Sequence, residues 1–267
     1  MDFSRKHVMG ILNITPDSFY DGNQYFQEKD ILNRVEQILN EGADIVDIGA
    51  FSSRPGAKLV SYNEERERLI PNLKKIVKKF PEAIISIDTF RHQIAKEAIE
   101  VGAHIINDIS AGNLDDKMFE VIEQLQVPYI IMHMKGIPEN MQKNPHYINV
   151  IEEIKAFFEN KINQLKKHRI HKVIIDPGFG FGKTLAQNFQ ILNNLKEFSI
   201  FEKTILVGIS RKSMLYKLLN KTPDDVLLAT SVAHTIALLN GANILRVHDV
   251  AEAVEVIKIV ESLKKTE

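Results

Sequence analysis

The chain has 267 residues and no cysteine, and its 34 Lys and Arg nearly balance 35 Asp and Glu, for a formal net charge of −1. The lack of cysteine excludes disulfides, thiolate chemistry and zinc sites built on Cys, and it fits a reducing compartment. Because the charges are spread over helix-like segments, no nucleic-acid or membrane partner is expected, and no apolar run approaches the ~20 residues of a membrane span. The composition predicts a cytoplasmic protein that acts on small molecules.

Strand-sized apolar runs recur along the chain, each separated from the next by a segment with helical spacing. They cover residues 7–13, 43–50, 83–89, 104–110, 128–134, 172–178, 204–210 and 244–250. Apolar runs without alternation are typical of strands buried on both faces, and strands that alternate with helices pair in parallel through right-handed crossovers. The pattern predicts an α/β fold, a (β/α)8 TIM barrel. Since no Pro-, Gly- or Ser-rich linker divides the chain, residues 1–267 are expected to form one domain.

Polar residues stand at or near the carboxyl end of every predicted strand. In a (β/α)8 barrel these ends open on one face, so their side chains converge. They are Asn13, Asp47, Asp88, Asn107, His133, Asp176, Ser210, Arg246 and His248. The strand-to-helix connectors 14–28, 51–60 and 135–146 are long and polar, as loops that carry function usually are. The architecture alone makes the chain an enzyme candidate.

The first two connectors hold candidate sites for a cation and an anion. Asn13 and the carboxylates that follow it could hold a hard cation through oxygen ligands while a phosphate oxygen completes its shell. Ordinary Asx turns are the alternative for this segment. Arg54, on a turn stiffened by Pro55 and Gly56, could bind an anion or merely solvate its loop.

Two carboxylates and an amide are expected together at the barrel mouth, from Asp88, Asn107 and Asp176. A carboxylate accepts two N–H bonds from an amino-pyrimidine edge, so this group suits a nitrogen-rich heterocycle. Capping of the following helices is the alternative for any one of the three. The glycine-rich run that follows Asp176 lacks the spacing of a P-loop and predicts a tight loop with Phe179 or Phe181 as an aromatic wall.

The last two predicted strands end in cationic side chains. Lys212 is expected at the mouth, and Ser213 as a helix cap that leaves N–H groups for a carboxylate or phosphate. Arg246 and His248 point to the same side of the eighth strand, and two such groups are costly inside a barrel without an anion. Barrels of this kind often hold phosphate at this place.

Eight segments at successive strand ends closely resemble the dihydropteroate synthase family of folate biosynthesis. They are Asn13-Ile-Thr-Pro-Asp-Ser-Phe19, Ser53-Arg-Pro-Gly56, Ser86-Ile-Asp-Thr89, Ile106-Asn-Asp-Ile-Ser110, Met132-His-Met134, Asp176-Pro-Gly-Phe-Gly-Phe-Gly-Lys183, Gly208-Ile-Ser-Arg-Lys-Ser213 and Arg246-Val-His248. The resemblance covers nearly the whole chain. It implies condensation of (7,8-dihydropterin-6-yl)methyl diphosphate with 4-aminobenzoate, which gives 7,8-dihydropteroate and diphosphate, with Mg2+ assisting the departure of diphosphate.

The resemblance also implies a role for individual residues. Catalysis would fall to Asp88, Asp176, Lys212, Arg246 and His248. The pterin would contact Asp88, Asn107, Ile109, Met132, Asp176, Gly208 and Lys212. The diphosphate would contact Asn13, Arg246 and His248, with Asn13 also at the metal. The aminobenzoate would contact Ser53, Arg54, Pro55, Phe181, Lys212 and Ser213. A homodimer through helices near the end of the chain is implied as well.

The residue types suit a dissociative substitution. Loss of diphosphate builds negative charge beside the strand 8 cations and positive charge on the pterin methylene, where carboxylates would stabilise it. Two alternatives stay open: a pterin-binding methyltransferase of the methyltetrahydrofolate type, which has no diphosphate to hold, and a pterin-binding module without catalysis. The family often has Gly-Glu-Ser-Thr-Arg-Pro-Gly on its second loop, whereas this chain has Phe51 in place of the acidic residue.

Overall fold

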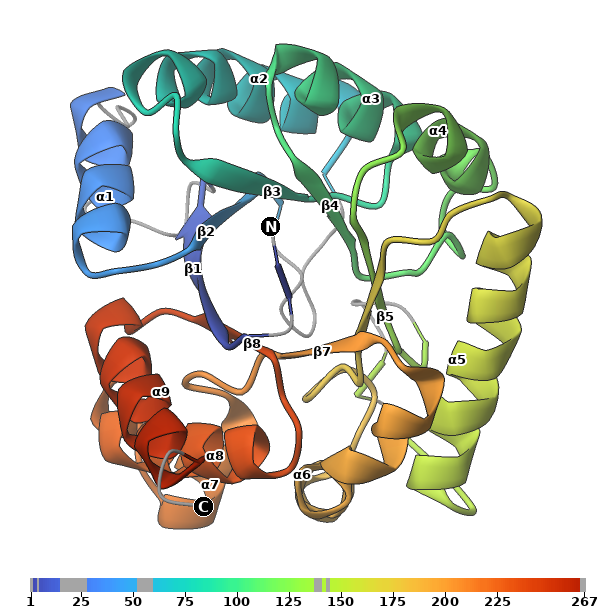
Figure 1. The fold of residues 1–267 in the computed structure, drawn as a ribbon, viewed down its shortest axis with the longest axis vertical. Coiled ribbons are helices and arrows are strands. Elements are labelled where there is room, and N and C mark those ends of the chain that lie inside the picture. The colour runs from blue at the N-terminus through green and yellow to red at the C-terminus, as the bar shows by residue number, and fades with distance from the viewer. Residues whose placement is uncertain are drawn as a thin grey trace.

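The computed structural model describes residues 2–3, 5–14, 28–51, 60–136, 141–142 and 145–264. Within these residues, eight parallel strands close into one barrel in the order of the sequence. They are β1 (His7–Asn13), β2 (Ile45–Gly49), β3 (Ile84–Asp88), β4 (Ile105–Asp108), β5 (Tyr129–Met132), β6 (Val173–Asp176), β7 (Thr204–Val207) and β8 (Ile244–Val247). The predicted (β/α)8 barrel is confirmed, and Figure 1 shows its ring of helices around the strands.

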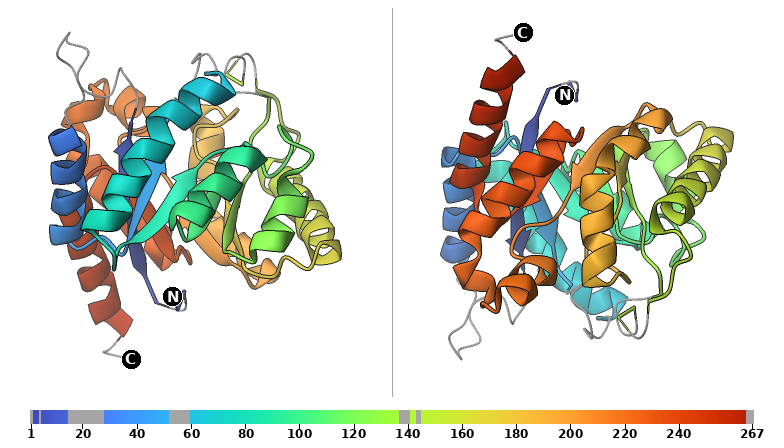
Figure 2. Two further views of the ribbon diagram at one scale, coloured as in Figure 1. Left: turned by 90° about the horizontal axis from the view of Figure 1, so that it is seen from above. Right: turned by 90° about the horizontal axis from the view of Figure 1, so that it is seen from below.

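The helices run alongside the strands on the outside of the barrel, as the two side views in Figure 2 show. They are α1 (Glu28–Asn40), α2 (Tyr62–Lys79), α3 (His92–Val101), α4 (Met118–Leu125), α5 (Val150–Lys167), α6 (Leu185–Asn193), η2 (Leu195–Phe201), α7 (Ser213–Leu219), η3 (Pro223–Asp225), α8 (Leu227–Leu239) and α9 (Val250–Lys264). Helix α1 buries Ile31, Val35 and Ile38, which lie on one face at helical spacing. Among the described residues, no helix is long and apolar enough to cross a membrane.

Alternation along each strand decides which side chains reach the interior of the barrel. In β2, Val46 and Ile48 belong to the large core between strands and helices, whereas Ile45 belongs to a separate cluster that fills the barrel. That inner cluster consists of Met9, Ile45, Ile105, Ile130, Ile174, Leu206 and Ile244. Two residues further along four of these strands stand Asp47, Asn107, Asp176 and Arg246. A polar layer therefore lies directly above an apolar floor.

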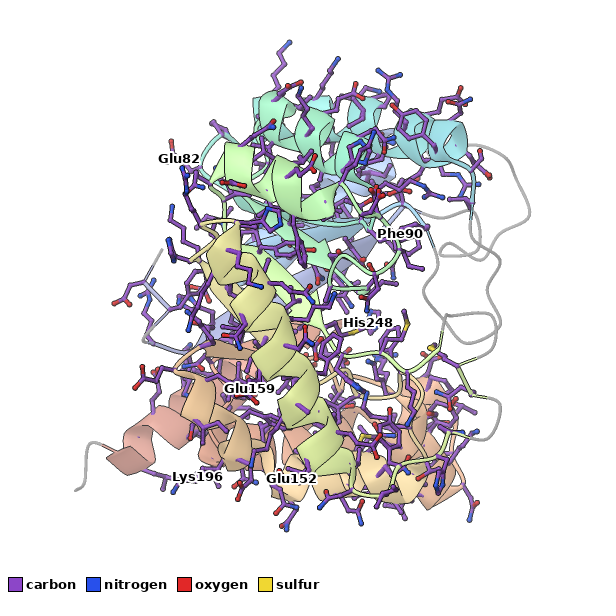
Figure 3. All side chains as sticks on the ribbon, turned by 90° about the vertical axis from the view of Figure 1, so that its right-hand side faces the viewer. Glu82, Phe90, Glu152, Glu159, Lys196 and His248 are labelled. Carbon is purple, nitrogen blue, oxygen red and sulfur yellow. The ribbon has the colours of Figure 1, made fainter. Side chains whose placement is uncertain are left out.

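Most strands end earlier than their apolar runs predicted, although β1 has the predicted bounds. The eighth run was expected over 244–250, but β8 ends at Val247. Burial continues past the strand because Val250, the first residue of α9, is fully buried against the barrel. His248 therefore lies just beyond β8. In Figure 3, His248 and Phe90 lie toward one end of the barrel and Glu82, which precedes β3, toward the other.

Candidate active site

Arg246 ties three strands together inside the mouth of the barrel. Its Nε donates to Asp47 Oδ2 at 2.7 Å, and its Nη2 donates to Asp88 Oδ2 at 3.1 Å. Asn107 Nδ2 donates to the same Asp47 oxygen at 3.2 Å. Since β8 and β3 are not neighbours in the barrel, these bonds cross its interior. The anions that pair with this largely buried arginine are thus carboxylates of the chain itself.

The electrostatics of this cluster leave room for a ligand. Burial raises the pKa of Asp88 to about 7, and Arg246 opposes that rise. Burial alone would lower the pKa of Arg246, but Asp47 and Asp88 raise it above its usual value. Among the described residues, Oδ1 of Asp47 and Oδ1 of Asp88 are buried without a hydrogen-bond partner. Because buried polar atoms are normally paired, these oxygens suit a ligand that donates N–H groups.

Asp176, at the end of β6, and Lys212, directly before α7, are a second pair of opposite charges that attract each other electrostatically. Asp176 Oδ1 accepts the backbone N–H of Gly178 at 2.7 Å. Lys212 Nζ donates to the carbonyl of Phe179 and lies 4.7 Å from the centre of the Phe181 ring. Burial lowers the pKa of Lys212 to about 8, while Asp176 opposes the shift. Burial raises the pKa of Asp176 in turn, against the attraction of Lys212.

An apolar wall borders the charged groups. Phe51, Phe90, Ile109 and Met132 form a buried cluster against which Phe181 packs. These residues follow or end successive strands, so the wall runs along one side of the mouth. A flat ring could lie against it while its polar edge reaches the carboxylates, an arrangement typical of small-molecule sites. Ile109, Met132 and Phe181 were predicted here, and the structure brings them together.

Phe51, where the family often has an acidic residue, is part of this wall. It is 3% exposed and meets Phe90 edge to face, with ring centroids 5.3 Å apart. The guanidinium of Arg91 lies 4.5 Å from the centre of the Phe90 ring and pairs with the buried Glu65. Phe51 thus makes an apolar contact where the family often has a carboxylate. Arg91, which lies over the ring of Phe90, is paired with Glu65 instead.

Asn13 lies beside Asp88 across a glycine. A Cβ atom added to Gly49 would be 3.6 Å from both Asn13 Oδ1 and Asp88 Oδ2, so the absence of a side chain keeps this space open. Asn13 offers the hard oxygen that Mg2+ accepts. The described residues contain no group of three or more His, Cys, Asp or Glu arranged to hold a metal. The donor set fits Mg2+ only if phosphate oxygens and water supply most of its ligands, as is usual for this ion.

The remaining predicted residues fall into three groups. Gly208 lies near both cations, because a Cβ added there would be 3.9 Å from Lys212 Nζ and 4.0 Å from Arg246 Cβ. The backbone N–H of His248 donates to Ser210 Oγ at 3.2 Å, which fixes the turn after β8. Ser53, Arg54 and Pro55 lie outside the described residues.

The capping roles considered for these residues are wrong where the structure describes them. Ser213 is the first residue of α7, and the capping position belongs to Lys212, whose side chain makes no capping bond. Lys212 has extended backbone angles, so the helix starts at Ser213, one residue earlier than a serine cap requires. Helix α3 has Arg91 at its cap and α6 has Thr184, so neither Asp88 nor Asp176 caps a following helix.

Two residues of this site received no role from the sequence. Asp47 was recognised only as a polar strand end, yet it is fully buried and accepts bonds from Arg246 and Asn107. A carboxylate inside the apolar run of β2 was the available signal, because a buried charge requires a partner. Lys183 is buried behind the glycine-rich loop, and its acceptors are backbone carbonyls, which no side-chain pattern reveals.

Comparison with known proteins finds relatives over the whole chain. Residues 9–248 match the family described as "Pterin binding enzyme". The dihydropteroate synthase of Escherichia coli K12 is 42% identical over 264 residues, which cover 98% of this chain and 93% of the relative. Identity at this level over nearly the full length of both chains favours the synthase over the two alternatives, a methyltransferase and a non-catalytic binding module.

Solved structures agree with the sequence relatives. Yersinia pestis dihydropteroate synthase in a sulfonamide drug complex matches with a TM-score of 0.94 at 41% identity, covering 99% of this chain and 96% of that one. The Xanthomonas albilineans enzyme with 4-aminobenzoic acid matches with a TM-score of 0.92 at 35% identity, covering 99% and 95%. The chain therefore belongs to the dihydropteroate synthase family of pterin-binding enzymes.

Proposed function

We propose that this chain joins (7,8-dihydropterin-6-yl)methyl diphosphate to 4-aminobenzoate by a dissociative substitution at the mouth of its barrel. The C–O bond to diphosphate breaks with its electron pair leaving on the diphosphate oxygen, the arylamine nitrogen bonds to the pterin methylene, and the nitrogen then loses a proton to solvent. The observation that carries this proposal is the pair of partnerless buried carboxylate oxygens beside Arg246 and the apolar wall.

The pterin is proposed to lie with its ring on Ile109 and Met132 and its nitrogen-rich edge toward carboxylates. Asp176, which the backbone N–H of Gly178 keeps oriented, would accept two N–H bonds from the amino-pyrimidine edge. Asp88 and Asn107 would contact the other edge of the ring. The same carboxylates would stabilise the positive charge that grows on the conjugated methylene as diphosphate departs.

The diphosphate is proposed to lie between Asn13, Arg246 and His248. Arg246 is held rigid by Asp47 and Asp88, so it would meet the growing negative charge of the leaving group without reorganising. A bound Mg2+ would supply a Lewis acid for that charge, with Asn13 and diphosphate oxygens as its ligands. Substitution by Mn2+ is compatible with the same hard oxygen donors.

The aminobenzoate is proposed to lie next to Phe181 and Lys212, with Ser213 and the second-loop residues Ser53, Arg54 and Pro55 completing its site. The relatives from Yersinia pestis and Xanthomonas albilineans have structures with a sulfonamide drug and with 4-aminobenzoic acid, respectively. Sulfonamides resemble 4-aminobenzoate and are therefore expected to compete at this site. A cytoplasmic location stays a prediction from the sequence.

The proposed reaction is tested by following diphosphate release and dihydropteroate formation together. Purified protein receives the pterin diphosphate and Mg2+, with and without 4-aminobenzoate, and a parallel sample contains a chelator. Dihydropteroate formed in step with diphosphate, and lost with the chelator, supports the proposal. Binding of the pterin without any release would contradict it.

A homodimer is proposed through one apolar face of α8. Leu228, Val232 and Leu239 lie on this face at helical spacing and are 78%, 53% and 58% exposed, respectively. The neighbouring helix α9 adds Ile259 and Leu263, also exposed. Clustered exposed apolar side chains of this kind usually mark an interface.

Val232→Glu is expected to convert the protein to a monomer, because a carboxylate cannot be buried between two apolar faces without a partner. Sedimentation velocity at several protein concentrations measures the change. Ile148→Glu, at a position 95% exposed before α5, is the matched control and should leave the oligomer intact. A wild-type protein that sediments as a monomer would contradict the proposed dimer.

A further inference from the structure

The glycine-rich run ends in a lysine that points into the protein. Lys183 is 3% exposed, and its Nζ donates to the carbonyls of Gly178 at 2.8 Å, Phe181 at 3.0 Å and His133 at 3.2 Å. Two of these acceptors belong to the loop after β6 and the third to the segment after β5. One side chain thus joins two neighbouring loops of the active-site face.

The three acceptors favour the charged form of Lys183. An ammonium group has three N–H donors, whereas a neutral amine has two and would turn its lone pair toward a carbonyl. The geometry therefore fits the ammonium, although burial holds the pKa of Lys183 well below its usual value. The charged groups that face it are Asp176, which favours the charge, and Lys212, which opposes it; the titratable His133 also lies beside it, and burial lowers the pKa of that imidazole.

The loop that Lys183 holds is pressed backbone to backbone against its neighbour. Gly178 and Gly182 have φ angles of +73° and +65°, and a Cβ added to them would lie 2.0 Å from the carbonyl oxygen of His133 and 2.3 Å from that of Lys135. Any other residue would clash and be strained, so the glycines make the close approach possible. Other side chains also bind this loop, since Asn188 Oδ1 accepts the N–H of Gly180 at 2.7 Å and the Tyr147 hydroxyl donates to the carbonyl of Gly182 at 3.0 Å. Lys183 binds it from its buried side and joins it to His133.

The same loop supports both charged groups of the second pair. The N–H of Gly178 binds Asp176, and the carbonyl of Phe179 accepts from Lys212. A change in the position of this loop would therefore move the acceptor and the donor that face the pterin. Distances at such a site matter because a displacement of about 1 Å can cost roughly a hundredfold in rate.

We propose that Lys183 is a positioning residue, which locks the 178–182 loop onto the end of β5 and thereby holds Asp176 and Lys212 in the geometry that binds the pterin. The inference rests on the proposed function of that pair. Lys183 touches no substrate in this arrangement and acts only through the loop. Its charge has a second effect, because together with Lys212 it favours the ionised form of Asp176.

Lys183→Met tests the proposal, since methionine has nearly the same length but removes the ammonium donor from all three carbonyls, of which that of Gly178 also accepts the N–H of Phe181 at 3.2 Å. Hydrogen–deuterium exchange of peptides covering 133–135 and 178–182 is expected to accelerate at least tenfold, with exchange in α3 unchanged. The kcat/KM for the pterin diphosphate is expected to fall at least tenfold. The acidic limb of its pH profile should move to higher pH, because Asp176 keeps only Lys212 and Arg246 as neighbouring cations.

Lys167→Met, at an exposed position in the last turn of α5, is the matched control and should change none of these quantities. If Lys183→Met does not fold, Lys183→Gln, which keeps N–H donors without the charge, takes its place in the same measurements. Unchanged exchange in 178–182 would overturn the proposal, and so would faster exchange with an unchanged kcat/KM and pH profile. Loop exchange does not depend on turnover, so a wild type without synthase activity refutes the proposed function and leaves the loop lock testable.

Discussion

Arg246→Ala is expected to lower kcat/KM about a thousandfold, the size of effect seen when one preorganised donor to a developing charge is removed. Arg246 is the group that both β2 and β3 carboxylates bind, at 2.7 and 3.1 Å. The variant is also expected to lose about 3 kcal/mol of unfolding free energy, because breaking a buried ion pair leaves its partner uncompensated. Steady-state kinetics and urea denaturation of the same preparation measure the two effects.

The two effects can be separated, because stability and catalysis depend on different partners of Arg246. Arg246→Met combined with Asp47→Asn removes one buried charge together with the cation and should recover part of the lost stability. Turnover should not recover, since the diphosphate still lacks its cation. If turnover returns along with stability, Arg246 acts only as a structural ion pair and its proposed contact with the diphosphate is wrong.

The polar layer of the site was predictable because it follows from strand periodicity. Asn107, Asp176 and Arg246 each stand two residues after an isoleucine of the inner cluster, so each points into the barrel. Knowing that parallel strands end on one face was then enough to bring these residues together. The direction of each side chain follows from the residue pattern of its own strand, so this prediction required no knowledge of contacts between distant segments.

Partner choice within the layer was not predictable in the same way. Arg246 was expected to need an anion, and a phosphate was the anion considered, whereas the structure supplies Asp47, 199 residues away in the sequence. Periodicity tells that both side chains point inward but not which of the inward groups come within 3 Å. The role of Lys183 was not predictable for a related reason. Its acceptors are backbone carbonyl groups, which every residue has, so no residue type in the sequence indicates them.

Asp176→Asn is expected to weaken pterin binding roughly tenfold or more, since a carboxylate that accepts two N–H bonds is replaced by an amide that can accept only on one side, and a bond to a charged group is worth about 1.5 kcal/mol or more. Titration calorimetry with 7,8-dihydropteroate measures the affinity. Asp116→Asn, on an exposed part of the β4–α4 connection, is the matched control and should bind normally. Unchanged affinity of Asp176→Asn would rule out the contact with the pterin edge.

Asp176→Asn is not expected to lower the stability of the fold, although it weakens pterin binding. Burial raises the pKa of Asp176 in the folded protein, so its ionised form is disfavoured there relative to the unfolded chain, and this cost is fully present once the pH exceeds the pKa of the folded protein. Asparagine removes the charge and can still accept the N–H of Gly178 through its oxygen. The unfolding free energy of Asp176→Asn at pH 8 is therefore expected to stay equal or to rise. A residue whose replacement leaves the stability of the fold equal or higher while it weakens pterin binding serves the ligand, because the fold alone would accept the amide.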